Sequence, residues 1–168
     1  PDYPLTPKYT YKDVFNMVEP LYKEIISKVD VKNLVMMGDS AGGGITLALA
    51  EKISQNNIQL PSKTILISPW LDVTLTNEKI KEVQKNDKDL NKEKLLIAGI
   101  SYARDEEGMK SYLVKPINGP LSKLKNVIIY TGTYDILNPD THLLQEKAKK
   151  EGIYLFTYPT AGYFDAFF

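Results

Sequence analysis

The segment Gly38-Asp39-Ser40-Ala41-Gly42 carries the residues of this chain that are best placed to do chemistry. An apolar run, Leu34 to Met37, precedes it, and a second apolar stretch follows from Ile45 to Ala50. A G-x-S-x-G pattern between a strand and a helix is typical of a nucleophile elbow, whose tight turn pushes the serine hydroxyl outward. We therefore predict that Ser40 is a nucleophile. Gly38 and Gly42 are expected to be glycines because bulk at either would collide with the neighbouring backbone. The alternative is a purely structural turn.

A serine hydroxyl is a weak nucleophile at neutral pH, so it needs a base, and the base needs an acid to orient it. In an elbow of this kind the acid follows the serine in the sequence, just beyond the C-terminal end of a later strand. Asp135 meets this requirement, since it follows the apolar run 126–131 through a short turn that contains Gly132. The alternative is that Asp135 only begins the next helix, a capping role that Asn138 or Asp140 could fill instead.

The elements that must position these residues alternate between strands and helices, which predicts an α/β fold with a mainly parallel sheet and helices on both faces. Periodicity and apolar runs predict strands over 33–37, 64–68, 126–131 and 153–158, and helices over 11–30, 41–55 and 139–150. The strand at 33–37 is apolar on both faces, as in a buried central strand. Pro20 is a candidate kink in the first helix, and Gly152 is a candidate C-cap of the last one.

Residues 71–118 interrupt this alternation. The region is polar and rich in lysine, with one helical stretch over 91–104 and no clear strand. We interpret it as a cap-like insertion over the edge of the sheet, within a single domain that spans 1–168. The alternative is that residues 71–118 form only a solvent-exposed surface loop.

Composition narrows the function further. The 21 basic and 21 acidic residues balance, so the net charge does not indicate electrostatic binding to nucleic acid or to a membrane surface. No apolar run reaches the roughly 18 to 20 residues of a membrane span. The absence of cysteine excludes disulfides and thiolate metal sites, and it suits a cytoplasmic protein.

Four stretches together resemble the hormone-sensitive-lipase-like esterases of the α/β-hydrolase family. They are Gly38-Asp39-Ser40-Ala41-Gly42-Gly43, Ser68-Pro69-Trp70-Leu71-Asp72, Gly132-Thr133-Tyr134-Asp135-Ile136-Leu137 and Asp2-Tyr3-Pro4-Leu5-Thr6-Pro7. The resemblance covers nearly the whole chain. It implies hydrolysis of short-chain carboxylic esters through an acyl-serine intermediate, with a small-molecule ester as the partner and no metal or cofactor. It also implies that Ser40 is the nucleophile, Asp135 the triad acid and the Ala41 backbone N–H an oxyanion donor.

The chain departs from that family at the base. The family's histidine is expected in a stretch that matches Gly162-Tyr163-Phe164-Asp165-Ala166-Phe167, where Asp165 stands in its place. A carboxylate has an unperturbed pKa of about 4, against about 6.5 for imidazole, so Asp165 would be a poor base. The alternative is that Asp165 is an ordinary solvated carboxylate. The single histidine, His142, is expected on the helix over 139–150, where it points away from the strand ends.

Other departures concern the periphery. Lys115-Pro116 stands where the family usually has Ser-Pro. The family's His-Gly-Gly oxyanion element and early strands would precede residue 1, and its final helix would follow residue 168. We therefore expect an incomplete sheet with an unpaired edge, which a second copy of the chain or further residues could cover. Two functions remain open: an ester hydrolase impaired by Asp165, and a non-catalytic ligand-binding protein on the same scaffold.

Overall fold

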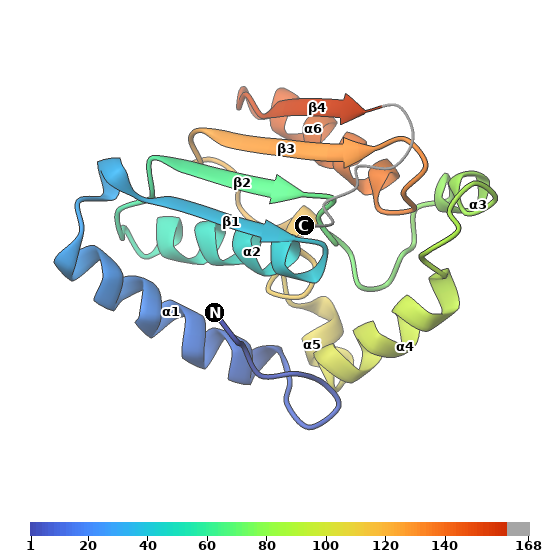
Figure 1. The fold of residues 1–168 in the computed structure, drawn as a ribbon, viewed down its shortest axis with the longest axis horizontal. Helices are drawn as coiled ribbons and strands as arrows, with labels where there is room; N and C mark the ends of the chain where they lie inside the picture. Colours follow the sequence, from blue (N-terminus) through green and yellow to red (C-terminus); the bar gives the residue numbers. More distant parts are fainter. Residues whose placement is uncertain (161–168) are drawn as a thin grey trace.

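The computed structural model describes residues 1–160 and contains a four-stranded parallel sheet in the order β1-β2-β3-β4 (Figure 1). The strands are β1 (Val35–Asp39), β2 (Lys63–Ile67), β3 (Val127–Gly132) and β4 (Phe156–Thr160). Each lies where the sequence predicts a strand, with ends shifted by a few residues. The predicted α/β fold with a parallel sheet is therefore confirmed.

Helices connect the strands. They are α1 (Tyr11–Lys28), α2 (Ala41–Gln55), α3 (Ile80–Val83), α4 (Lys92–Ala103), α5 (Glu106–Lys110) and α6 (Asn138–Lys150), with short 3-10 helices at Val31–Asn33 and Pro116–Asn118. Helix α1 begins at a capping box, in which the Thr10 N–H donates to Asp13 over 2.8 Å. It then continues through Pro20 as one element. Helix α6 ends at Lys150 with Glu151 as its C-cap residue, and Gly152 follows with φ +73°, the left-handed conformation that terminates many helices.

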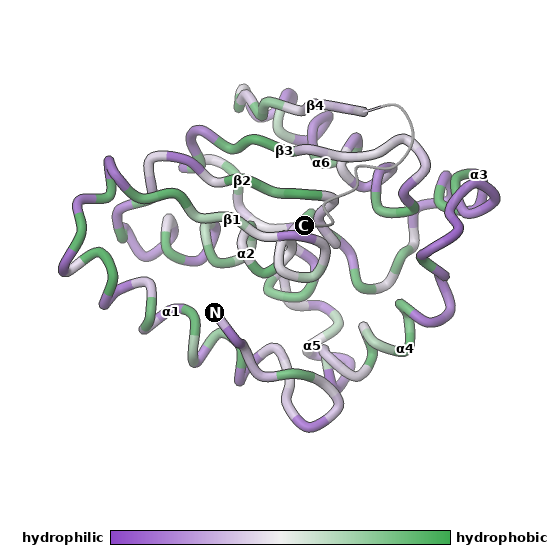
Figure 2. The backbone as a smooth tube through the Cα atoms, in the orientation of Figure 1, coloured by the Kyte–Doolittle hydropathy of each residue, from purple (hydrophilic) through white to green (hydrophobic). Residues whose placement is uncertain are grey.

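One of two buried core clusters lies between one face of the sheet and helices α2 and α6. Its fully buried side chains include one large aliphatic residue from each of α2, β2, β3 and α6: Leu47, Leu66, Ile129 and Leu144. Burying each contributes about 1.5 to 3 kcal/mol relative to leaving it exposed. Figure 2 shows the apolar runs of β2 and β3, which carry Leu66 and Ile129. The sheet and helix α2 therefore form a fixed base for the turn between them.

The prediction of a buried central strand at 33–37 is wrong for the described residues. Strand β1 is the edge strand, with β2 as its one neighbour in the sheet. Val35 and Met37 are 48% and 62% exposed. Because successive residues of a strand point to opposite faces, these two side chains share the face that α2 does not cover. The apolar character of both faces is real, but burial of the second face needs a covering layer that residues 1–160 do not supply.

The segment 71–118 contains short helices α3 and α5 in addition to the predicted one, α4. Its apolar side chains Val73, Leu75, Ile80, Ala103 and Val114 join the same buried cluster as residues of α1 and α2. Gly99 of α4 packs so closely on the Val73 backbone that a Cβ there would meet the Val73 carbonyl oxygen at 2.6 Å. Helices α4 and α5 lie beside the N-terminal segment, beyond the C-terminal ends of the strands (Figure 1).

A search of the described helices for one with the length and apolar character to span a membrane finds none.

Candidate active site

Ser40 lies in the turn between β1 and α2, and its backbone has φ 51° and ψ −116°. Such a conformation costs on the order of 1 to 3 kcal/mol for a residue with a side chain, so the surroundings must hold it. Three backbone hydrogen bonds do so. The Ser40 N–H donates to Ile67 over 2.9 Å, and the Ser40 carbonyl accepts from Trp70 over 2.9 Å and from Gly44 over 3.1 Å. The strained turn of the predicted elbow is therefore present and fixed from both sides.

The glycines around Ser40 have different roles. A Cβ at Gly38 would collide with the Gly42 carbonyl and the Thr46 hydroxyl, so no side chain fits there. Gly43 lies against Pro69, where a Cβ would come within 2.9 Å of the proline ring, and Gly44 lies against the Trp70 carbonyl. The prediction for Gly42 is wrong, because a Cβ at that position meets nothing within 4 Å. The close approach is made by the next two residues of α2, Gly43 and Gly44, where the helix crosses the segment after β2.

Helix α2 begins at Ala41, directly after the serine. The first N–H groups of a helix have no acceptor within the helix, and they carry its positive dipole end. The Ser40 side chain makes no capping hydrogen bond to these groups. The Ala41 N–H and the Ser40 hydroxyl thus lie at the same helix end, as an oxyanion donor and a nucleophile must.

Asp135 follows β3 at the same edge of the sheet. All four strands are parallel, so their C-terminal ends meet at one edge, and β2 alone separates β1 from β3. With neighbouring strands about 4.8 Å apart, the ends of β1 and β3 are about 10 Å apart. That span suits two side chains that reach toward a third group between them.

The Asp135 side chain is 6% exposed, and its carboxylate accepts the Leu137 N–H over 2.8 Å. Burial raises the pKa of Asp135; the hydrogen bond from Leu137 and the nearby Ser68 hydroxyl oppose this, and the charges of Asp87 and Asp39 add to it. The Asp135 carboxylate therefore has hydrogen-bond donors that favour its ionised form and neighbouring like charges that disfavour it.

The suggested capping roles of Asn138 and Asp140 are wrong. The N-cap of α6 is Leu137, without a side-chain hydrogen bond. The Asn138 amide donates instead to Thr131 over 3.2 Å, and Asp140 accepts from Asn77 over 3.0 Å. Of the three candidates, Asp135 alone accepts from the backbone at the helix start, so it combines that local role with its place at the sheet edge.

The Ser68-Pro69-Trp70-Leu71-Asp72 motif builds the wall beside the elbow. The Trp70 indole N–H donates to the Asp72 carbonyl over 3.0 Å. The buried Asp72 carboxylate accepts from the Thr74 N–H over 2.8 Å and from the Thr74 and Thr76 hydroxyls. Lys115 lies 3.3 Å from the same carboxylate. The lysine that replaces the family's serine thus forms a partly buried ion pair with the motif's aspartate.

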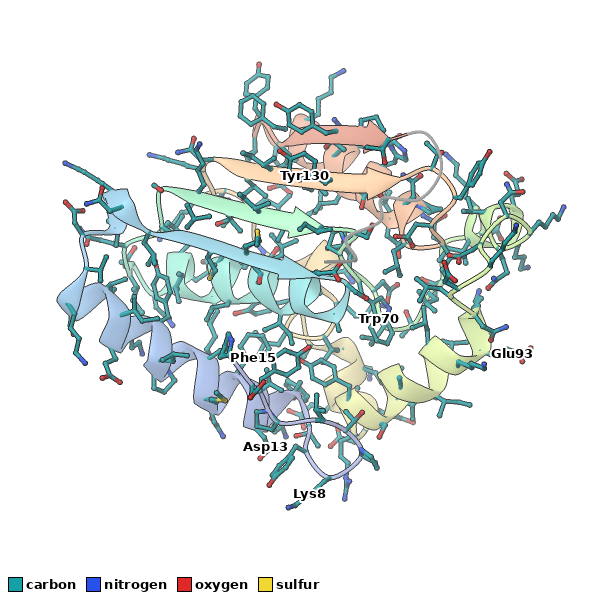
Figure 3. The ribbon with its side chains drawn as sticks, in the orientation of Figure 1. Lys8, Asp13, Phe15, Trp70, Glu93 and Tyr130 are labelled. Atoms are coloured by element: carbon teal, nitrogen blue, oxygen red, sulfur yellow. The ribbon has the colours of Figure 1, made fainter. Side chains whose placement is uncertain are left out.

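A cavity of about 190 Å³ adjoins the elbow at Ala41 and Gly44. Its walls are mostly apolar, and they come from three parts of the chain: the N-terminal segment with Tyr3 and Leu5, the motif residue Trp70, and the 71–118 segment with Ala98, Tyr102 and Leu113. Figure 3 shows Trp70 between the strand ends and helices α4 and α5. An apolar cavity of about 150 Å³ holds one benzene ring, so this one accepts a group of similar or slightly larger size.

The base is the part of the predicted site that the structure leaves untested. Asp165 lies outside the described residues. His142 is exposed on α6, as predicted, and lines a separate polar cavity with Asp140 and Glu146. Within residues 1–160, no three His, Cys, Asp or Glu side chains are grouped so that they could hold a metal ion.

Comparison with known proteins gives consistent results. Residues 1–167 match a family described as the alpha/beta hydrolase fold. A curated relative from Acinetobacter venetianus named "Esterase" is 31% identical over 153 residues, which are 90% of this chain and 50% of the relative. A solved structure of EstE5 with PMSF is 25% identical, with a TM-score of 0.86 over 95% of this chain and 53% of that one. An esterase from the bacterial hormone-sensitive lipase family is 21% identical and shares the fold, with a TM-score of 0.87 over 97% of this chain and 56% of that one.

The chain therefore spans about half the length of these proteins.

Proposed function

The chain belongs to the α/β-hydrolase family, as its resemblance to the hormone-sensitive-lipase-like esterases predicts, and from this membership we propose that it is the nucleophile-bearing part of a carboxylic ester hydrolase. The observation that carries the proposal is the strained Ser40, held by three backbone hydrogen bonds at the start of α2. Strain of this kind persists where it serves a site.

In the proposed reaction, the Ser40 hydroxyl oxygen attacks the ester carbonyl carbon while its proton moves to a base. The carbonyl oxygen becomes an oxyanion that the Ala41 N–H stabilises at the positive end of α2. The alcohol leaves with a proton, and an acyl-serine remains until water hydrolyses it. Asp135 orients the base from its place after β3.

The cavity beside the elbow supports a small group on one side of the ester. Its size favours acyl or alcohol groups of about six to eight non-hydrogen atoms over long chains. Residues 71–118 supply much of its wall, which supports the cap-like role of this segment in a single domain over 1–168. EstE5 was solved with PMSF, a reagent for activated serines, which supports the same chemistry here.

We further propose that Asp165 takes the position of the base and that the chain is impaired as a result. A carboxylate near Asp135 accepts a proton weakly, although the like charge would raise one of the two pKa values. Loss of one residue of a catalytic triad typically lowers the catalytic rate by several orders of magnitude. The rate enhancement that remains comes from the oxyanion donors and from substrate binding.

A fluorophosphonate probe tests the nucleophile. We expect stoichiometric labelling of the Ser40 peptide, detected by mass spectrometry, and none in Ser40→Ala. Turnover of p-nitrophenyl acetate should be slow, absent in Ser40→Ala, and about 10²- to 10⁴-fold faster in Asp165→His. Turnover that persists unchanged in Ser40→Ala would contradict the serine mechanism, and an unimproved Asp165→His would contradict the role of Asp165.

A non-catalytic ligand-binding protein is the second candidate, favoured by one observation: the aspartate at position 165 where the family has its base. In that case a small apolar ligand would occupy the cavity at Trp70 without reaction at Ser40. Saturable quenching of Trp70, the one tryptophan of the chain, together with no fluorophosphonate labelling would favour this function over the first.

A further inference from the structure

Asp87 is a buried carboxylate that neither the elbow nor the sequence motifs account for. It lies in the 71–118 segment between α3 and α4, and it is 8% exposed. Aspartate is rarely buried to this degree unless its oxygens have donors. Both oxygens of Asp87 do.

One oxygen organises the loop that contains Asp87. Its Oδ1 atom accepts the Asp89 N–H over 3.0 Å and the Leu90 N–H over 2.8 Å. The Gln84 side chain fixes the same loop from a second direction, since it donates to the Leu90 carbonyl and accepts the Lys92 N–H. The loop therefore holds the Asp87 carboxylate in one orientation.

The other oxygen reaches across the fold. Its Oδ2 atom accepts the Ile136 N–H over 2.9 Å, a buried hydrogen bond between residues 49 positions apart in the sequence. Ile136 directly follows Asp135, and the next N–H, that of Leu137, donates to Asp135 itself. Two consecutive backbone donors are thus divided between two carboxylates, one from the insertion and one from the sheet edge.

We propose that Asp87 is a positioning residue that ties the 71–118 insertion to the loop of Asp135 and holds Asp135 in the orientation that the triad requires. This inference rests on the proposed function in giving Asp135 a catalytic role. The hydrogen bond itself, from the insertion to the loop of Asp135 between β3 and α6 (residues 133–137, the acid loop), is independent of that role. Hydrogen bonds to a charged acceptor are stronger than neutral ones, and in a buried place they are costly to break.

The same arrangement sets the charge around Asp135. Two ionisable groups face it with like charge: Asp87 from the insertion and Asp39 from the end of β1. Asp87 therefore orients the loop through its hydrogen bond and disfavours the ionised form of Asp135 through its charge. Asp87→Asn removes the charge at constant volume, so the pKa of Asp135 should fall, with Asp39 unchanged.

The test compares Asp87→Ala and Asp87→Asn with Asp105→Ala, a matched control. Asp105 is also an aspartate of the insertion and accepts a backbone N–H, from Gly108 over 2.7 Å, but it caps α5. We expect amide hydrogen exchange at Ile136 to become about ten- to a hundredfold faster in Asp87→Ala, with no change in Asp105→Ala. Carboxyl ¹³C NMR should show the Asp135 titration shifted to lower pH in both Asp87 variants, which lack the charge of Asp87, and unchanged in Asp105→Ala.

Labelling of Ser40 by the fluorophosphonate should slow about tenfold in Asp87→Ala and remain unchanged in Asp105→Ala. If the wild-type chain is not labelled at all, the proposed function fails. The hydrogen exchange of Ile136 and the titration of Asp135 still test whether Asp87 holds the acid loop. The inference is overturned if Ile136 exchange is unaffected by Asp87→Ala, or if Asp105→Ala accelerates it equally. The inference is also overturned if the pKa of Asp135 is the same in Asp87→Asn as in the wild type. If Asp87→Ala does not fold, this measurement on Asp87→Asn still tests the inference.

Discussion

The elbow and the acid loop lie at the same edge of the sheet but are held in different ways. Ser40 is fixed by backbone hydrogen bonds to Ile67, Trp70 and Gly44, and by glycines that let two backbones touch. Asp135 is fixed through carboxylates: its own, which accepts from Leu137, and that of Asp87, which accepts from Ile136. Backbone contacts tolerate almost no change of shape, whereas carboxylate contacts depend on charge and pH.

This difference indicates where each half of the site is vulnerable. An added methyl group should damage the elbow and leave its response to pH unaltered. A change of charge should alter the acid loop while the elbow keeps its geometry. Single substitutions at the elbow, at the buried carboxyl groups and at their partners separate these two kinds of support.

The largest effect is expected at Gly38. Gly38→Ala places a Cβ against the Gly42 carbonyl and the Thr46 hydroxyl, so β1 and α2 must move apart, at a cost of about 3 kcal/mol in the free energy of unfolding. Gly43→Ala meets Pro69 at 2.9 Å and the Gly38 carbonyl oxygen at 3.2 Å, which are less severe contacts, so it should cost less, about 1 to 2 kcal/mol. Urea unfolding followed by the fluorescence of Trp70 measures both.

Gly42→Ala is the control within the same motif. Its Cβ enters open space in the first turn of α2, so we expect no loss of stability, and a gain of up to about 1 kcal/mol from helix propensity. Equal destabilisation by Gly38→Ala and Gly42→Ala would contradict the idea that the elbow depends on one specific backbone contact.

The elbow could be predicted from the sequence because its determinants are close together in the chain. The apolar strand, the glycines and the start of α2 all fall within residues 34–50, and a strand followed by a helix has few ways to make that turn. The one error, at Gly42, came from assigning both glycines of the motif the same reason. The structure shows that Gly43 and Gly44 make the close approach to the next segment.

The acid loop was only half predictable. The position of Asp135 after an apolar strand led to its prediction as the triad acid, but nothing in the local sequence indicated Asp87, whose partner is 49 residues away. Asp87 lies in a lysine-rich loop that resembles any solvated surface. The edge position of β1 was also missed, because an apolar strand has the same sequence pattern whether or not its second neighbour and covering layer are present.

Helix α2 carries another buried carboxyl group, that of Glu51. Glu51 is fully buried, and neither of its oxygens has a hydrogen-bond partner among the described residues. Burial raises its pKa well above the usual 4.5, and the charge of Lys147 only partly opposes this. Lys147 itself donates to the Ile117 and Gly119 carbonyls. Unlike Asp135, Glu51 has burial without donors.

Glu51→Met should therefore stabilise the fold by about 1 to 3 kcal/mol at pH 7, because it replaces an unpaired polar group with an apolar one of similar size. The unfolded chain ionises Glu51 near pH 4.5 while the folded chain retains the proton, so wild-type stability falls as pH rises above that value. The gain in Glu51→Met should grow over the same range, and below pH 4 it should fall to the smaller part that comes from replacing the neutral, unpaired carboxyl group.

Urea unfolding at several pH values measures this gain, and Glu146→Met, at an exposed glutamate of α6, is the control with little expected effect. A gain that does not depend on pH, or that Glu146→Met reproduces, would argue that Glu51 has partners that hold its charge.

The smallest effect is expected at Lys115. Its ammonium lies 3.3 Å from the buried Asp72 carboxylate, which keeps its three threonine hydrogen bonds when the lysine is removed. Lys115→Gln should therefore cost about 1 kcal/mol in the free energy of unfolding, between the values for exposed and fully buried pairs.

Lys28→Gln is the control, because it breaks an exposed pair with Glu24 and should cost at most about 0.5 kcal/mol. At 1 M salt the Lys28 effect should disappear while most of the Lys115 effect persists, because solvent screens the first pair and the wall around Trp70 shields the second. Equal salt dependence of the two effects would contradict this prediction, because it would mean that solvent screens the Lys115–Asp72 pair as fully as an exposed one. Ion pairs at this edge of the sheet would then stabilise the site less than the backbone hydrogen bonds of the elbow do.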